Sequence, residues 1–427
     1  MDRISNLTDD LLLKIVSSLP TKDVVATMIL SKRWRFLWTM LPKLDFDYDY
    51  DYDSDSKLKR SEYERFVKYV DRSLVFNRAP VLETLKFRVG PFYTSEDLAT
   101  WMRIGMVRQV REIEISACAD NRSIVELPKS LYTCKKLEVL KLAYVDVDDV
   151  PDDFCFPSLK SLHLVCATIG TETEETYCKL FSSCPVLEEL VLDIMASFRV
   201  EIPTLQRLSI RDTCNPPNDG DDDRKVVIIV PSLKFLNFVV TCDNLCLFEN
   251  MPEVVEANVK VVFENPDKLL ECLPSVKRLC LCLSASMLHH RIGFDHLVDL
   301  ELCVSASGWW DLLTWMLQSS PKLQVLKLCP CKEYLCTIHS FKSNKGRWRG
   351  PTSVPECLMF HLHTFKWIDY NQNDKEKNIA AYILKNARQL KTAGFSWRWC
   401  SKEEKSLKIN ELVSLPRASS SCQLILD

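Results

Sequence analysis

The stretch Pro157-Ser158-Leu159-Lys160-Ser161-Leu162-His163-Leu164 contains a pattern that returns along most of the chain. An apolar residue is followed by a second three places later and by a third two places after that. The copies begin at Leu82, Val110, Leu137, Leu159, Leu187, Leu205, Leu233, Val254, Val276, Leu297 and Leu323. Successive copies start 18 to 28 residues apart. A fixed pattern at this period predicts a repeat architecture in which each copy supplies one short strand.

The period is that of a leucine-rich repeat, in which each unit adds a strand to a parallel sheet. Short amphipathic segments lie between the strands, and they predict outer helices around Tyr177-Leu180-Phe181 and around Leu312–Leu317. A proline often precedes the first apolar residue by two places, at Pro80, Pro157, Pro185, Pro203, Pro231, Pro252, Pro274 and Pro321. Proline restrains the backbone, so we expect an extended approach to each strand. We predict an α/β solenoid of about eleven irregular units over residues 61–345.

Alternation along each strand predicts which side chains leave the core. The residue between the last two apolar positions should point to the concave face. On this basis we expect a target to contact Lys86, Lys141, His163, Asn237, Asn258, Glu301 and Lys327. The row is mixed in sign and partly apolar, which favours a protein partner over a polyanion. The alternative is a face that is merely solvated.

Residues 1–45 predict three short helices with a surplus of apolar side chains. Thr8 precedes the first helix, Pro20 ends it, and Thr21 and Ser31 can cap the second and third. Three helices of this length cannot enclose so many large apolar residues, so we expect them to dock on something larger. The alternative is an independent three-helix domain with its own core.

This segment resembles an F-box, the docking module of SCF-type ubiquitin ligases. The resemblance rests on Ile4–Leu7, Asp10–Leu12, Ile15, Leu19–Asp23, Leu30–Arg35 and Leu37-Trp38. It implies that a Skp-type adaptor, and through it a cullin scaffold, is bound by Leu7, Ile15, Leu19, Pro20, Leu30, Trp34 and Trp38. The chain departs from the family at Thr8, where proline is usual, and at Met28, where a small residue is usual. The first change removes a rigid turn.

Residues 45–53 alternate aspartate with phenylalanine or tyrosine. Aspartate at every second place disfavours a strand. We therefore expect a mobile acidic linker over residues 46–60, separating the first helices from the repeats.

Residues 346–427 differ in composition from the repeats. Val354–Leu358, Phe365–Tyr370 and Ala380–Lys391 resemble the FBD domain that follows leucine-rich repeats in plant F-box proteins. The family often has glycine after the tyrosine, whereas here Asn371-Gln372-Asn373 follows Tyr370, and Glu376 is retained. We expect an α+β unit that caps the end of the solenoid, with 423–426 as a last edge strand.

Composition excludes several classes of function. The formal net charge of −3 means that the chain has no excess of basic residues to bind nucleic acid. No apolar run is long enough to span a membrane. The 19 cysteines are scattered and odd in number, which favours a cytoplasmic or nuclear protein with buried thiols. The sequence contains no G-x-S-x-G, P-loop or H-E-x-x-H motif. Cys280-x-Cys282 is poorly spaced for zinc. We expect no catalytic residue, no cofactor and no metal.

Together these features predict a non-catalytic substrate-recognition subunit of an SCF-type ligase. Its repeats would hold an unknown target protein for ubiquitination. The alternative is an interaction scaffold outside any ligase, with a weakened F-box.

Overall fold

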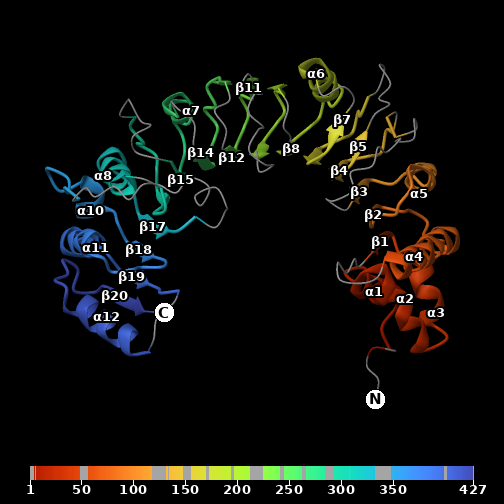
Figure 1. Cartoon of the computed structure of the whole chain (residues 1–427), viewed down its shortest axis with the longest axis horizontal. Helices are drawn as coiled ribbons and strands as arrows, with labels where there is room; N and C mark the ends of the chain where they lie inside the picture. The colour runs from red at the N-terminus through yellow and green to blue at the C-terminus, as the bar shows by residue number, and fades with distance from the viewer. Residues whose placement is uncertain are drawn as a thin grey trace. The chain divides into compact units, whose positions relative to one another are not determined.

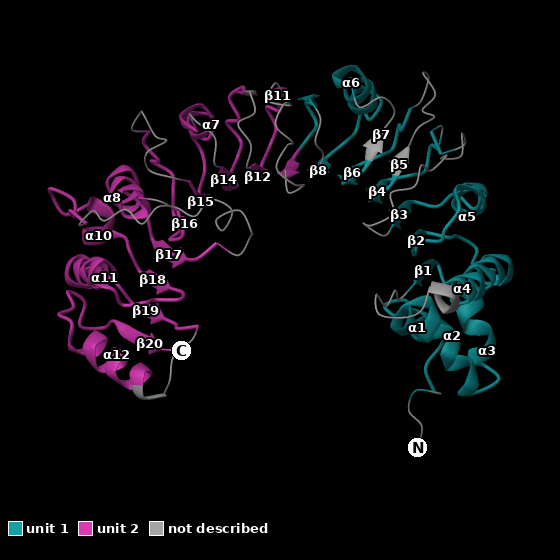
Figure 2. Ribbon diagram, viewed as in Figure 1, with its two compact units in different colours: residues 1–205 teal, residues 206–427 magenta. Residues whose placement is uncertain are grey.

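The computed structural model describes residues 4, 6–48, 56–117, 131–132, 134–147, 155–169, 173–193, 197–211, 225–240, 245–261, 266–283, 292–306, 308–331, 348–398 and 402–426. The chain divides into two compact units, unit 1 (Met1–Leu205) and unit 2 (Gln206–Asp427) (Figure 2). Within each unit, the helices that connect successive strands lie on one face of a parallel sheet (Figure 1). The described part of the chain has no helix that combines the length and the apolar character needed to cross a membrane.

Unit 1 begins with short helices and continues as strands alternating with connections. Its elements are α1 (Asp9–Val16), α2 (Thr21–Ala26), η1 (Thr27–Ile29), α3 (Trp34–Leu37), η2 (Trp38–Met40), β1 (Lys43–Asp47), α4 (Ser56–Phe76), β2 (Thr84–Arg88), α5 (Ser95–Val107), β3 (Glu112–Ser116), β4 (Val139–Ala143), β5 (Asp146–Val147), β6 (Ser161–Val165), β7 (Thr168–Ile169), α6 (Glu174–Ser182), β8 (Glu189–Asp193) and β9 (Phe198–Glu201). The main sheet has the order β1-β2-β3-β4-β6-β8, and all its strands are parallel.

Unit 2 repeats this arrangement through to the C-terminal region. Its elements are β10 (Arg207–Arg211), β11 (Lys225–Ile229), β12 (Phe235–Val240), β13 (Leu245–Phe248), β14 (Glu256–Val261), α7 (Asp267–Glu271), β15 (Arg278–Cys282), β16 (Asp299–Cys303), α8 (Trp309–Ser319), β17 (Val325–Cys329), α10 (Glu356–Phe360), β18 (Thr364–Trp367), α11 (Asp374–Asn386), β19 (Thr392–Phe395), α12 (Lys402–Ser414) and β20 (Gln423–Leu426). The sheet order is β10-β12-β14-β15-β16-β17-β18-β19-β20.

Each copy of the apolar pattern forms a strand, which confirms the predicted repeats. The last two apolar residues of a copy point into the core, as Leu162 and Leu164 of β6 do, both fully buried. They stack in register on the neighbouring strands, with Leu162 between Leu140 and Leu190. The predicted helices α6 and α8 also form, and the C-terminal region contributes α11; the apolar stripes of all three are buried. The leucine positions therefore form a continuous apolar layer within each unit.

The prolines act differently from the extended approach that we expected. In most copies the residue before the proline accepts a hydrogen bond from the N–H of the first apolar residue, as Phe156 does from Leu159 at 3.2 Å. The same bond joins Ile202 to Leu205 and Val230 to Leu233. The proline thus occupies the second position of a tight turn, where its fixed φ is favourable. The turn, rather than an extended segment, directs the chain into each strand.

The expected linker over residues 46–60 is wrong at both ends, while residues 49–55 lie outside the described residues. Phe46 and Asp47 belong to β1, and α4 begins at Ser56. Phe46 is fully buried and stacks on Phe87 of β2, with ring centroids 5.6 Å apart. The aspartates fall on the opposite face of the strand, where Asp47 pairs with Arg88 at 2.6 Å. Alternating acids are compatible with this strand because only one of its faces is in the core.

The first helices are joined directly to the sheet through Thr21. This residue is 1% exposed, and its hydroxyl accepts a hydrogen bond from the backbone N–H of Asp45 in β1 at 2.7 Å. The side chain of Asn77, at the end of α4, donates to the carbonyl of Leu41 at 2.9 Å. Helices, β1 and α4 therefore form one body within unit 1.

Thr21→Val should loosen β1 from the helices. Valine keeps the shape but removes the acceptor, so the N–H of Asp45 loses its hydrogen bond, at a cost of about 1–3 kcal/mol. We expect faster amide hydrogen exchange in β1 and a lower unfolding midpoint. Thr8→Val is the matched control, because exposed Thr8 makes no capping hydrogen bond. Equal effects of the two substitutions would contradict this role of Thr21.

The C-terminal strands extend the sheet of unit 2. β18, β19 and β20 pair in parallel with one another, and β18 pairs with β17. Residues 423–426 form the last strand, as expected. The turn after Tyr370 uses Gln372, whose φ of 64° is in the left-handed region that favours glycine. The buried carboxylate of Glu376 holds this turn by accepting the N–H groups of Asn371 and Gln372 at 2.8 and 2.9 Å.

Candidate interaction surfaces

The N-terminal helices expose a dense group of apolar side chains, which we call the apolar patch. Ile29 is 90% exposed, Phe36 69% and Leu30 63%. The complete patch consists of Ile4, Leu11, Ile15, Leu19, Ile29, Leu30, Phe36 and Met40. Elsewhere in the described residues, large exposed apolar side chains are more widely scattered along the chain. Large exposed apolar residues concentrated in one short stretch of the chain indicate a surface that another molecule covers.

Most of the residues predicted to contact an adaptor lie at the surface. Ile15, Leu19, Pro20 and Leu30 are exposed, and Leu7 and Trp38 are half-buried. The apolar patch also contains residues that the sequence interpretation did not name as adaptor contacts, namely Ile4, Leu11, Ile29, Phe36 and Met40. The helical positions of the buried Leu12 and Val16 could have indicated Leu11, because neighbouring residues on a helix face different directions.

Trp34 does not belong to this surface. Its side chain is 7% exposed and lies with Leu37 in the interior of the helices. The ring fills the core of these short helices, so little of Trp34 is exposed to a partner, and its contact with an adaptor stays a prediction. Phe36, on the same short helix, points outward instead.

Arg33 fixes the start of α1 without the proline that is usual before it. Thr8 precedes α1 and makes no side-chain capping hydrogen bond. The guanidinium of Arg33 donates to Asp9 at 2.6 Å and to the carbonyl of Leu7. These contacts tie the beginning of α1 to the segment before α3. Met28, the other unusual residue, is half-buried.

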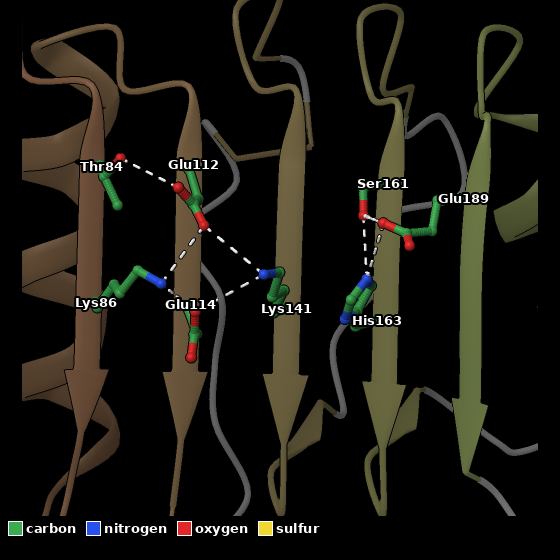
Figure 3. Close-up of polar contacts among 8 residues, drawn as sticks. All are labelled: Thr84, Lys86, Glu112, Glu114, Lys141, Ser161, His163 and Glu189. Atoms are coloured by element: carbon green, nitrogen blue, oxygen red, sulfur yellow. Dashed lines mark hydrogen bonds and ion pairs between the residues drawn. The ribbon is translucent and has the colours of Figure 1, made fainter. Parts of the chain in front are cut away.

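The predicted contact residues of unit 1 lie in one row across the sheet, and each is paired within the row (Figure 3). The Nζ of Lys86 lies 2.7 Å from Glu114 and 3.6 Å from Glu112, and the Nζ of Lys141 lies 3.8 Å from Glu112. Burial opposes the charge of Lys86, but its hydrogen bond to Glu114 and the nearby carboxylates raise its pKa. Burial likewise opposes the charge of Glu114, but Lys86 and Lys141 lower its pKa. The row is thus largely self-neutralised.

His163 continues this row next to Ser161 and Glu189 (Figure 3). Its Nε2 lies 3.1 Å from the Ser161 hydroxyl and 3.3 Å from the Glu189 carboxylate, and that hydroxyl donates to the same carboxylate at 2.7 Å. A serine–histidine–acid relay needs the serine and the acid on different ring nitrogens. Here both lie against one nitrogen, so the arrangement is a hydrogen-bonded cluster without the geometry of a relay. Burial lowers the pKa of His163, and Glu189 offsets this in part.

Acidification should destabilise unit 1 through His163. As the pH falls below about 6.5, the unfolded chain takes up a proton before the folded chain, whose His163 pKa is lowered. The contribution of His163 to the free energy of unfolding is complete above that pH. It is lost as the pH falls through the pKa of His163 in the folded chain. The groups facing His163 are Ser161, Glu189, Lys141 and Glu114. We expect the urea midpoint to drop between pH about 7.5 and about 5.5, and to drop less in His163→Gln. Equal drops would contradict this assignment.

The predicted contact residues of unit 2 also bond to their neighbours. Asn237 is only 6% exposed; its amide donates to Ser209 and its oxygen accepts from Asn258, both at 2.7 Å. Glu301 accepts the thiol of Cys329 at 3.3 Å and that of Cys280 at 3.9 Å. Burial, with Glu301 close by, raises the pKa of Cys280 to about 12. The Nζ of Lys327 lies 3.0 Å from Asp299.

The sequence therefore indicated that these side chains share one face of the sheet but not that they pair with one another, and their contact with a target stays a prediction. Side chains on neighbouring strands are close enough to bond when the repeats are in register. Asn237 is buried and belongs to a ladder of hydrogen bonds with Ser209 and Asn258, which leaves little of its side chain exposed to a target. More exposed charges lie at the ends of the strands, and Arg88 and Arg278, 64% and 58% exposed, are examples.

Comparisons with known proteins agree with this architecture. Residues 4–46 match the F-box domain, residues 98–214 match the repeats described as "FBD-associated F-box protein At5g56370, LRR repeats", and residues 350–395 match FBD. Among Arabidopsis thaliana proteins, the chain is 59% identical to putative FBD-associated F-box protein At3g50710 over 442 residues, covering 100% of both. It is 43% identical to F-box/FBD/LRR-repeat protein At5g56420 over 436 residues, covering 100% of this chain and 99% of that one. The chain belongs to the plant F-box/FBD/leucine-rich-repeat family.

Proposed function

We propose that the chain is the substrate-recognition subunit of an SCF-type ubiquitin ligase. In this role the apolar patch binds a Skp-type adaptor, the adaptor joins the chain to a cullin scaffold, and the repeats bind a target protein. The observation that carries the proposal is the cluster of exposed apolar residues on the helices that match the F-box, with Ile29 90% exposed. A surface of this kind suits a permanent partner better than solvent.

The contacts between the helices and the sheet support a receptor that presents its target in a defined position. Thr21 bonds the helices to β1, and Asn77 bonds the end of α4 to Leu41 just before β1, without a flexible spacer among the described residues. A rigid connection between the N-terminal helices and the repeats raises the effective concentration of a bound target at the ligase. The chain would need no catalytic residue of its own, because holding the target close to the ubiquitin-loaded conjugating enzyme raises the rate of ubiquitin transfer.

The polar row of unit 1 supports a protein target. Lys86, Lys141 and His163 are each within 4.0 Å of a carboxylate of their own sheet. A polyanion such as nucleic acid would have to displace these carboxylates, and the formal net charge of −3 offers no compensating attraction. A folded protein with its own mixture of polar and apolar groups fits such a surface better.

Co-purification with an adaptor and a cullin tests the proposal. The full chain should bring down a Skp-type adaptor alone, and should bring down a cullin only when the adaptor is present. Failure to bind the adaptor would leave the non-ligase scaffold as the better interpretation. Cullin binding without the adaptor would contradict the assigned role of the apolar patch.

A further inference from the structure

Three cysteine sulfur atoms meet at one end of neighbouring strands in unit 2. Cys282 ends β15, Cys303 ends β16, and Cys331 follows the end of β17. The three Sγ atoms all lie within 4.8 Å of one another. Cys282 and Cys303 are 6% and 5% exposed, and the half-buried Cys331 packs against them. We call this group the thiol cluster.

We propose that the thiol cluster binds a thiophilic metal ion, with Zn²⁺ as the first choice. Zinc–sulfur bonds of about 2.3 Å in a tetrahedral site place sulfur atoms about 3.8 Å apart. The thiol cluster reaches this spacing if its sulfurs approach by about 1 Å or less. Soft thiolate ligands select zinc over magnesium or calcium. Each thiol releases its proton to solvent as the metal–sulfur bond forms, so three thiolates hold the ion.

Two other cysteines on the same face have a different role. The thiols of Cys280 and Cys329 are directed to the carboxylate of Glu301, at 3.9 and 3.3 Å. The thiol cluster is therefore one part of a larger set of neighbouring cysteines, in which Cys303 and Cys329 are register partners. A general need for small side chains does not explain Cys282, because its register partner on β14 is Lys260. The same position of the strand accepts a long side chain one repeat earlier.

A hydrogen bond beside the thiol cluster connects the segments that follow two of its strands. The N–H of Cys331 donates to the hydroxyl of Ser305 at 3.1 Å, which ties the segment after β17 to the segment after β16. Ser305 and Pro330 line a cavity of about 290 Å³ whose wall includes Glu376 and Lys408. The cavity borders the segments that follow β16 and β17. A water molecule would complete a tetrahedral site as the fourth ligand.

Metal content of the full chain, purified without a histidine tag, tests this site. We expect about one zinc ion per chain after gel filtration in metal-free buffer. Replacing zinc by Co²⁺ should give a thiolate-to-metal charge-transfer absorption in the near ultraviolet. Both signals should disappear in the Cys282→Ser/Cys303→Ser/Cys331→Ser variant. Neither the zinc content nor the Co²⁺ absorption depends on adaptor binding. The outcome of this test is therefore independent of the proposed ligase role.

The matched control is Cys134→Ser/Cys155→Ser/Cys178→Ser, which removes the same number of thiols from unit 1 and should keep both signals. If the first triple variant does not fold, the single variant Cys331→Ser replaces it, because this side chain is only half-buried. It should retain the fold and lose most of the zinc. A wild-type chain without zinc, zinc retained by both cluster variants, or loss of zinc in the control would overturn the proposal.

Discussion

The variant Ile15→Asp/Leu19→Asp should lose adaptor binding by at least about 100-fold, while its fold is unchanged. Both side chains are about half exposed, at 54% and 43%, so a carboxylate at either position remains in water in the free chain. In the complex the same carboxylates would be buried in an apolar interface without partners, at several kcal/mol each. The measurement is adaptor affinity by calorimetry, with circular dichroism as the check on folding.

The control variant is Val75→Asp/Val107→Asp. These valines are 74% and 83% exposed and lie on α4 and α5 of the same unit, outside the apolar patch. The control carries the same change in charge and should bind the adaptor as the wild type does. If both double variants lost affinity equally, the effect would be due to charge and not to the apolar patch.

Trp34→Ala should unfold the N-terminal helices, whereas Phe36→Ala should leave them folded. Trp34 is 7% exposed and Phe36 is 69% exposed, although both lie on α3. Removing a buried tryptophan costs about 3–5 kcal/mol, which is a large share of the stability of so small a core. Removing an exposed phenylalanine leaves no cavity, and its expected effect is weaker adaptor binding.

Amide hydrogen exchange over residues 9–40 distinguishes these two effects. Protection should be lost throughout α1, α2 and α3 in Trp34→Ala and retained in Phe36→Ala. Protection retained in Trp34→Ala, together with lost adaptor binding, would instead return Trp34 to the contact surface where the sequence interpretation had placed it.

The strands of the repeats could be predicted because each depends on a local pattern. Leu159, Leu162 and Leu164 reveal their strand through spacing alone, and the same spacing recurs in every copy. The strand β1 was missed because its aspartates argue against a strand until the buried face formed by Leu44 and Phe46 is considered. A single segment outside the repeat period offers no second copy for comparison.

Contacts between repeats could not be predicted in the same way. The pairing of Lys86 with Glu114 and of Glu301 with Cys329 joins residues 28 positions apart, and it depends on the register of neighbouring strands. The thiol cluster illustrates the same difficulty. The spacing of Cys280 and Cys282 within one strand argued against a metal site, whereas the three sulfurs that meet come from three consecutive repeats.

The most direct test of the ligase role compares the proteins that the chain captures with the proteins whose turnover depends on it. Proteins bound by the repeats should accumulate when the chain is removed from plant cells. They should accumulate equally when the chain is replaced by Ile15→Asp/Leu19→Asp, which still binds them but no longer binds the adaptor. Captured proteins whose abundance and ubiquitination stay constant in both cases would contradict a substrate-recognition role.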